Sequence, residues 1–175
     1  KSKGRLKGAK INLDPVSVTA TENILMAAVL AEGETTIFNA AKEPEVVDLV
    51  NCLKKMGAQI KGEGSDKLVI VGVESLSGCD YSVMPDRVET ATYLTAVAMT
   101  GGKIKIKGTR PEAIQSIVIK LKESGALIES GEDWVSLSME RERPLPASLS
   151  TGPYPSFPTD MQAQFIALNT IAEVD

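Results

Sequence analysis

Apolar residues recur at spacings of three and four in several stretches of the chain, the pattern of helices with one buried face. The clearest stretch follows Glu43, and its apolar residues are Val46, Leu49, Val50, Leu53 and Met56. Pro44 suits the first turn because the amide that proline lacks has no helical partner there. Gly57 suits a C-terminal cap. The pattern therefore predicts a helix that ends at Met56.

A second helix and three strands are predicted around this one. Residues 19–22, Thr-Ala-Thr-Glu, have the spacing of a capping box and predict a helix start, with the helix ending at Gly33. The β-branched run at residues 35–38 predicts a strand. Residues 58–60 and 67–73 predict two paired strands across the Gly-rich turn between them.

The same order of elements then recurs along the chain. Residues 53–58 and 121–126 share Leu-Lys at the start and Gly-Ala at the end, at a constant offset of 68 residues. The second copy predicts a helix at 90–100, a strand at 103–107, a helix that ends at Gly125, and a hairpin of 126–128 with 134–137, with Trp134 in the core. A third copy starts at Pro158 and comprises one helix. Coincidental similarity of two α/β segments is the alternative, and the constant offset argues against it.

The predicted fold class is α/β, with repeated β-α-β-α-β-β modules of about 70 residues, longer than the usual solenoid repeat. Residues 75–81 connect the first two copies. Residues 141–158 connect the second to the third and contain five prolines, which exclude regular structure and predict an extended segment.

Composition narrows the classes of function. The 175 residues are 43% hydrophobic and 24% charged, enough for a folded core, and the net charge of −4 argues against nucleic-acid binding by bulk positive potential. No apolar stretch approaches the roughly 20 residues of a membrane span. Histidine is absent and the only cysteines are Cys52 and Cys79, which indicates a cytoplasmic location, no disulfide framework and no metal site. Both thiols are interpreted as inert.

Several strings together resemble the UDP-N-acetylglucosamine enolpyruvyl transferase family. They are Gly-Arg-Leu-Lys-Gly-Ala at 4–9, Val-Ser-Val-Thr-Ala-Thr at 16–21, Ala-Lys-Glu-Pro-Glu at 41–45, Pro-Asp-Arg-Val-Glu-Thr at 85–90, and Phe-Pro-Thr-Asp-Met-Gln-Ala-Gln at 157–164. The last string is the most specific. The match covers the whole chain without a large gap.

The resemblance implies two domains, each a threefold repeat arranged as an inside-out α/β barrel. Residues 1–84 would be the closing part of the first domain, and residues 85–175 the opening part of the second, truncated in its next repeat. It also implies transfer of enolpyruvyl from phosphoenolpyruvate to the 3-hydroxyl of UDP-N-acetylglucosamine, in peptidoglycan precursor synthesis, with no cofactor. The family's reactive cysteine, its Lys-Asn pair and one arginine would lie outside this chain, so the segment alone is expected to be inactive.

By the resemblance, Asp160 is the catalytic aspartate that contacts the sugar hydroxyl, and Thr159 beside it binds substrate. A carboxylate suits this role because the attacking hydroxyl must lose its proton. Without the family string, Thr159-Asp160 would be interpreted as a helix N-cap.

Ser17, Val18 and Thr19 match the segment that approaches the nucleotide diphosphate, at a helix start where free amides favour an anion. A capping role without a ligand is the alternative, and both can hold. Pro15 stands where some family members have a lysine beside the diphosphate, which removes one charged contact.

Arg87 matches an arginine at the domain junction near the active site of the family, and Glu43 and Glu45 match acidic residues that line the cleft. The alternative for Arg87 is a surface ion pair with a neighbouring acid, worth well under ~1 kcal/mol. The alternative for Glu43, and for Glu45 with it, is a favourable interaction with the helix dipole.

Two further alternatives concern the whole chain. One is a non-catalytic ligand-binding or assembly module of the same fold, and the other is the shikimate-pathway sister family, which lacks this set of strings. The incomplete third repeat also predicts an exposed apolar face around Phe165, Ile166 and Leu168, through which chains would self-associate.

Overall fold

The computed structural model describes residues 4–173, which fold as two compact units, Lys1–Met84 and Pro85–Asp175. Each unit has its own sheet and its own hydrophobic core. Assignment of the units to the closing and opening parts of two family domains stays a prediction.

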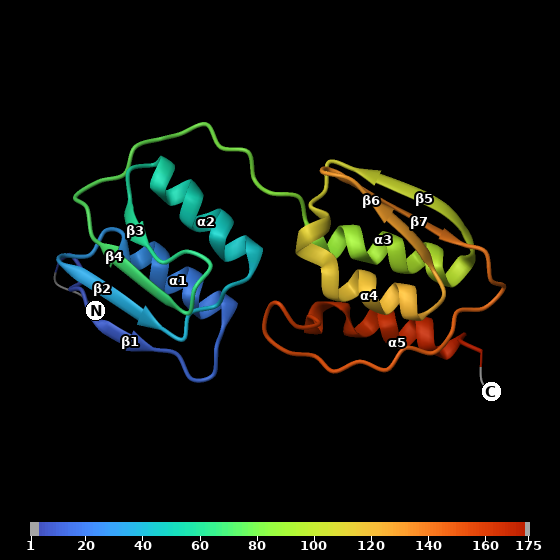
Figure 1. Ribbon diagram of the computed structural model, residues 1–175. Helices are drawn as coiled ribbons and strands as arrows, with labels where there is room; N and C mark the ends of the chain where they lie inside the picture. Colours follow the sequence, from blue (N-terminus) through green and yellow to red (C-terminus); the bar gives the residue numbers. More distant parts are fainter. Residues whose placement is uncertain (1–3, 174–175) are drawn as a thin grey trace. The chain divides into compact units, whose positions relative to one another are not determined.

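Unit 1 is a four-stranded sheet with two helices (Figure 1). Its elements are β1 (Lys10–Asn12), α1 (Val18–Ala28), β2 (Glu34–Phe38), α2 (Pro44–Lys55), β3 (Gln59–Lys61) and β4 (Lys67–Val71). The strand order is β1-β2-β4-β3, with β1 parallel to β2 and the other pairs antiparallel. This is the predicted β-α-β-α-β-β module.

The core of unit 1 lies between the sheet and its helices. Ile37 of β2 is paired with Leu68 of β4, and both are almost fully buried. Leu25 of α1 and Val50 of α2 are completely buried in the same cluster. The spacing of three and four in α2 therefore marks a buried face, as predicted, and Gly57 follows this helix with φ of +104°.

Unit 2 repeats the arrangement with a three-stranded antiparallel sheet of order β5-β7-β6. Its elements are α3 (Arg87–Thr100), β5 (Gly102–Lys107), the 3₁₀ helix η1 (Pro111–Ile114), α4 (Gln115–Glu123), β6 (Leu127–Ser130), β7 (Trp134–Met139), the 3₁₀ helix η2 (Thr159–Met161) and α5 (Gln162–Thr170). In the part of the chain that the structure describes, this second module has no counterpart of β1. Helix α3 lies between the sheet and α5 (Figure 1).

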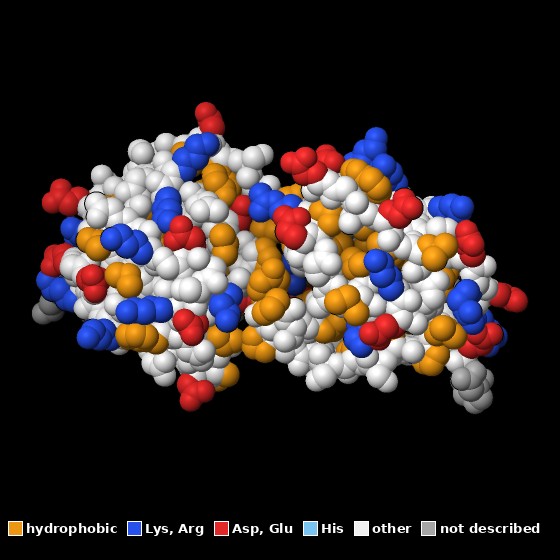
Figure 2. All heavy atoms as spheres, in the orientation of Figure 1, with side chains coloured by type: hydrophobic (Ala, Val, Ile, Leu, Met, Phe, Trp, Pro, Cys, Tyr) orange, Lys and Arg blue, Asp and Glu red, His pale blue; other side chains and the backbone are white. Residues whose placement is uncertain are grey.

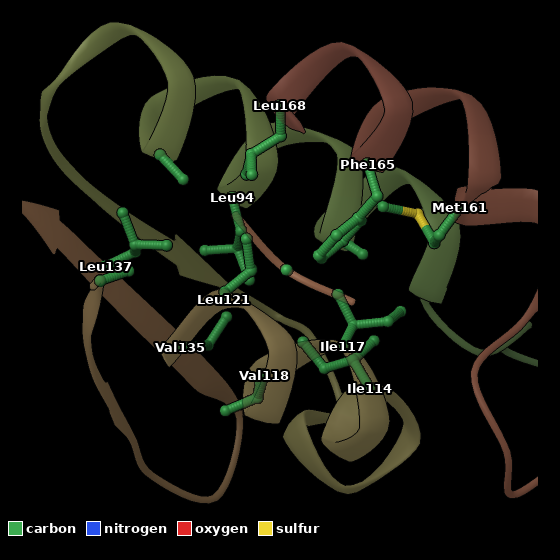
Figure 3. Close-up of a cluster of buried hydrophobic side chains, with 14 of the residues drawn as sticks. Leu94, Ile114, Ile117, Val118, Leu121, Val135, Leu137, Met161, Phe165 and Leu168 are labelled. Carbon is green, nitrogen blue, oxygen red and sulfur yellow. The ribbon is translucent and has the colours of Figure 1, made fainter. Parts of the chain in front are cut away.

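The core of unit 2 joins all three helices to β7 (Figure 3). Leu94 of α3, Leu121 of α4 and Phe165 of α5 are 0%, 0% and 1% exposed. Leu168 is also completely buried, so the prediction of an exposed face around Phe165 and Leu168 is wrong. Only Ile166, which is 57% exposed, lies on the outside.

The Pro-rich segment at 141–158 explains this burial. It contains no helix and no strand apart from one isolated bridge, as predicted, and it passes beside α5. The Phe157 ring meets the Phe165 ring edge to face at 4.9 Å. Asn169 accepts a hydrogen bond from the Ala147 amide at 2.9 Å and donates one to the Ala147 carbonyl at 3.0 Å. Residues 141–158 thus cover part of α5, which the prediction of an exposed face did not take into account.

Two local predictions need correction. Helix α1 begins at Val18 with Ser17 as its N-cap, so the predicted Thr19–Glu22 capping box does not form. Trp134 lies outside the core: its indole packs over Gly131 and beneath the Lys105 ammonium, 3.6 Å from the ring centroid. The Lys105 side of β5 is thus a solvent-facing side, as the alternation of Lys and Ile indicates.

On the face shown in Figure 2, the Lys and Arg side chains are interspersed with Asp and Glu. Over residues 4–173, no helix combines the length and the apolar character needed to span a membrane.

Candidate functional site

The predicted diphosphate contacts lie at the start of α1 in unit 1. Ser17 has extended backbone, and its Oγ accepts a hydrogen bond from the Ala20 amide at 3.2 Å. Val18 is half-buried and Thr19 is exposed. The amides of a first helical turn have no intrahelical acceptors, so this end of α1 can receive an anionic oxygen.

Thr21 joins the start of α1 to the loop that precedes α2. Its hydroxyl donates to the Ser17 carbonyl at 2.7 Å and accepts from the Ala41 amide at 3.0 Å, in a fully buried position. The loop leads directly to Glu43, the N-cap residue of α2, which is 7% exposed. The structure therefore brings Ser17 and Glu43, predicted from separate strings, into one region of unit 1.

Three carboxylates share this region. Burial raises the pKa of Glu22 above its ordinary value, and the negative charges of Glu45 and Glu43 raise this pKa further. Glu45 lies in the first turn of α2, where an acid also complements the helix dipole. Both interpretations of Glu43 and Glu45 therefore remain compatible with their positions.

The raised pKa gives Glu22→Gln a pH-dependent effect. At neutral pH the charged form of the wild-type carboxyl is less favourable in the folded chain than in the unfolded chain. The variant should therefore have the higher melting temperature at pH 7. Below the ordinary glutamate pKa of 4.5 the advantage should disappear, because the carboxyl is protonated in both states. Thermal unfolding at several pH values measures this, with the exposed Glu74→Gln as the matched control. A constant advantage at every pH would contradict the electrostatic cause.

Arg87 is the first residue of α3 in unit 2. The preceding Asp86 caps this helix, since its Oδ1 accepts from the Val88 amide at 2.7 Å and from the Glu89 amide at 3.1 Å. Arg87 is only 7% exposed, so any ion pair that it makes is not at the surface. A buried guanidinium is a fixed donor group rather than a mobile surface charge.

Asp160 is exposed and lies in the first turn of η2. The N-cap of η2 is Pro158, and no side chain caps this helix or α5. The interpretation of Thr159-Asp160 as an N-cap is therefore wrong. Thr159 is exposed as well, so both side chains are accessible to a ligand.

The position of Asp160 is set by the residues that follow it. Met161 is completely buried in the core of unit 2 (Figure 3). Gln164 donates through Nε2 to the Thr92 hydroxyl at 2.9 Å, and Thr92 lies one turn beyond the start of α3. The starts of η2 and α3 therefore lie in the same part of unit 2, and Asp160 and Arg87 with them. Sequence reasoning missed Thr92, although its partner Gln164 belongs to the most specific string.

Two surface hollows can be compared with the predicted site residues. One, of about 280 Å³, is beside the start of α3 and is lined by Pro85, Asp86, Glu89, Thr90, Tyr93, Ile106, Lys107, Gly108 and Thr109. The other, of about 390 Å³, is on the sheet of unit 1 and includes Lys54, Gln59, Lys61 and Val71. Neither is lined by a predicted site residue. Between residues 4 and 173, no group of three or more Cys, Asp or Glu side chains is arranged to hold a metal ion.

Comparison with known proteins defines the class first. The model of the EPSP synthase (3-phosphoshikimate 1-carboxyvinyltransferase) family matches residues 1–174. The chain belongs to this family, whose fold the repeated modules and their sheets already indicated.

Similar sequences then narrow the relationship. The chain is 58% identical over 170 residues to the UDP-N-acetylglucosamine 1-carboxyvinyltransferase of Shewanella amazonensis, and 56% identical to the enzyme of the same name from Cellvibrio japonicus. Each match covers 97% of this chain but only 41% and 40% of the relative. The chain thus spans about two fifths of the length of these relatives.

Solved structures agree on the fold. The enolpyruvyl transferase NikO from Streptomyces tendae superposes with a TM-score of 0.82 at 25% identity, over 97% of this chain and 43% of that one. An EPSP synthase from Acinetobacter baumannii gives a TM-score of 0.60 at 21% identity, over 83% and 34% of the two chains. The predicted enolpyruvyl transferase fold is therefore confirmed.

Proposed function

We propose that this chain is the central part of a UDP-N-acetylglucosamine 1-carboxyvinyltransferase. The complete protein would transfer enolpyruvyl from phosphoenolpyruvate to the 3-hydroxyl of UDP-N-acetylglucosamine by addition and elimination. The reaction would serve peptidoglycan precursor synthesis in the cytoplasm, and hence cell-wall biogenesis, cell shape and cell division. The observation that carries the proposal is 58% identity across 97% of the chain to an enzyme of that name.

In this mechanism Asp160 accepts the proton of the sugar hydroxyl as its oxygen attacks C2 of phosphoenolpyruvate. Uptake of a proton at C3 completes the addition, and loss of inorganic phosphate from C2 with a proton from C3 then restores the double bond of the transferred group. The exposed position of Asp160 suits contact with a substrate, and Thr159 beside it is assigned to substrate binding. A positioned base of this kind contributes ~10²- to 10⁴-fold to a rate.

Other residues are assigned to binding. Ser17, Val18 and Thr19 at the start of α1 would receive the diphosphate, supported by the amides of the first turn. Glu43 and Arg87 would contact the substrates from their buried positions. Pro15, in the Asp14–Pro15 turn before Ser17, offers no cation for the diphosphate.

The two alternative functions, the shikimate-pathway sister and a non-catalytic module, are less well supported. The shikimate-pathway sister is disfavoured because the solved EPSP synthase is only 21% identical to this chain. A non-catalytic module would bind UDP-N-acetylglucosamine without turnover in its complete form. We keep the transferase because the strings at 16–21 and 157–164 supply both a binding segment and a base.

Phosphate release tests the proposal. The complete protein that contains this chain should release phosphate when it is given phosphoenolpyruvate and UDP-N-acetylglucosamine together, and not when shikimate 3-phosphate replaces the nucleotide sugar. The 175 residues alone should release none above background, because one aspartate cannot replace several missing electrostatic groups. Turnover by the isolated chain, or none by the complete protein, would contradict these expectations.

Ser17→Ala in the complete protein should weaken binding of the nucleotide sugar more than turnover. A contact made equally in the ground and transition states changes KM and leaves kcat nearly unchanged. Because Ser17 is also the N-cap of α1, the variant should lose about 1 kcal/mol of stability. Ser17→Asn is the matched control, since asparagine keeps the cap. Steady-state kinetics and thermal unfolding separate the two roles; equal KM values for the alanine variant and the wild type would remove Ser17 from the binding site.

A further inference from the structure

The connection that follows β4 runs back along helix α2. Ser77 begins the contact: its amide and its hydroxyl both donate to the Met56 carbonyl at the end of α2, at 2.9 and 3.2 Å. Further along, the Tyr81 hydroxyl bonds the carbonyl and the carboxylate of Asp48, at 3.0 and 2.9 Å. We call residues 77–84 the strap. The strap therefore lies antiparallel to α2, from its last turn to its middle.

The two cysteines face each other across this contact. Asp48, Cys52 and Met56 are four residues apart on α2 and share one helix face. Cys79 lies in the strap between Ser77 and Tyr81, so it falls opposite Cys52. Cys79 is near enough to Cys52 to raise the pKa of its thiol, and both residues are half-buried. Lys55, on the same side of α2, donates to the Asp80 carbonyl and holds the strap beside Cys79.

The chemistry of the pair differs from that of two independent thiols. Burial raises the pKa of Cys52, and the nearby Cys79 raises this pKa further. Cys52 is therefore mostly a thiol at neutral pH and a poor nucleophile for outside reagents. Two thiols that the fold holds opposite each other react without a diffusional encounter, which favours reaction within the pair.

We propose that Cys52 and Cys79 are a redox-sensitive pair that closes into an intrachain disulfide and fastens the strap to α2. With hydrogen peroxide as the oxidant, one thiolate first attacks a peroxide oxygen and becomes a sulfenic acid, with hydroxide as the leaving group. The second sulfur then displaces water from the sulfenic acid and forms the S–S bond. Over the two steps, two thiols lose two hydrogens and one peroxide becomes two waters.

The bond would act on the connection between the two units. The strap leads directly to Pro85 and to helix α3, and its last residues are held to Asp48 of α2 by the Tyr81 hydroxyl and the Met84 amide. A disulfide at Cys79 would add a covalent link to the hydrogen bonds that Asp80, Tyr81 and Met84 make with α2. Oxidation would thereby keep the strap on α2 even when these hydrogen bonds open. This inference is independent of the proposed function, since it uses no substrate.

The test begins with the full 175-residue chain and hydrogen peroxide at mildly alkaline pH. We expect the loss of both reactive thiols from a chain that stays monomeric on a non-reducing gel, and a peptide map with residues 52 and 79 in one disulfide-linked fragment. The unfolding equilibrium constant of unit 1 should fall roughly 10²-fold on oxidation, the usual effect of closing a loop of this size. Sulfinic acids without the linked fragment, or disulfides only between chains, would overturn the proposal.

Matched controls use the single variants Cys52→Ser and Cys79→Ser. Each should keep one reactive thiol and give no intrachain bond and no gain in stability. If a variant fails to fold, a glutathione titration of the wild type alone still tests the proposal. In glutathione buffers, the native chain should form the bond at a lower fraction of oxidised glutathione than the chain in urea. Equal fractions in both conditions would show that the fold does not bring the thiols together and would overturn the proposal.

Discussion

Replacement of Asp160 by asparagine in the complete protein should lower kcat by ~10²- to 10⁴-fold while the melting temperature hardly changes. The rate falls because asparagine keeps the shape of the side chain but cannot accept the hydroxyl proton. Stability is preserved because Asp160 is exposed and caps no helix. Steady-state phosphate release and thermal unfolding of the same preparations give both quantities.

The matched control is Asp133→Asn, the same chemical change at an exposed turn of the β6–β7 hairpin. It should leave both kcat and the melting temperature unchanged. Near-normal turnover by Asp160→Asn would remove the aspartate from the catalytic step. A loss of turnover that accompanied unfolding would assign it a structural role instead.

Phe165→Ala should destabilise unit 2 by about 3–5 kcal/mol, the usual loss for a buried phenylalanine. The ring is 1% exposed, and the alanine would leave a cavity beside Phe157 and lose their edge-to-face contact. Urea unfolding followed by the fluorescence of Trp134, the only tryptophan, reports on this unit. The neighbouring Ile166→Ala is the matched control, because Ile166 is 57% exposed.

Ile166→Ala should change the free energy of unfolding by well under 1 kcal/mol, as is typical of surface positions. Equal losses for the two variants would mean that α5 does not pack as described. The comparison also tests whether α5 is a surface for self-association. Phe165 and Leu168 are buried, so they are not available for contact with another chain.

The order of the elements could be predicted because each is marked locally. Apolar spacing, Pro44 and Gly57 predicted α2, and the offset of 68 residues carried the same assignment to α4 and to Gly125, whose φ is +93°. The start of α1 was misplaced because Ser17 and Thr19 are both acceptable caps and only the backbone decides between them. Strand β1 is three residues long, too short for its alternation to be recognised.

The burial of α5 could not be predicted, since it depends on contacts between residues far apart in the sequence. Phe157 and Ala147 come from a segment without periodicity, and nothing in its composition indicates which helix it covers. The candidate site shows the same difference between residues that have a local sequence signal and residues that do not. Its residues were found through the strings they belong to, whereas Thr92, which holds Gln164, belongs to none of them.

The two hydrophobic cores have no residue in common. Unfolding of such a chain is described by two equilibrium constants rather than one, and a single midpoint would average two different events. Substitutions in separate cores should have additive effects, because they share no neighbours. A ligand that binds only at the first turn of α1 would stabilise unit 1 by mass action. The unfolding equilibrium of unit 2 should not change. The separate cores therefore predict that each unit has its own melting transition.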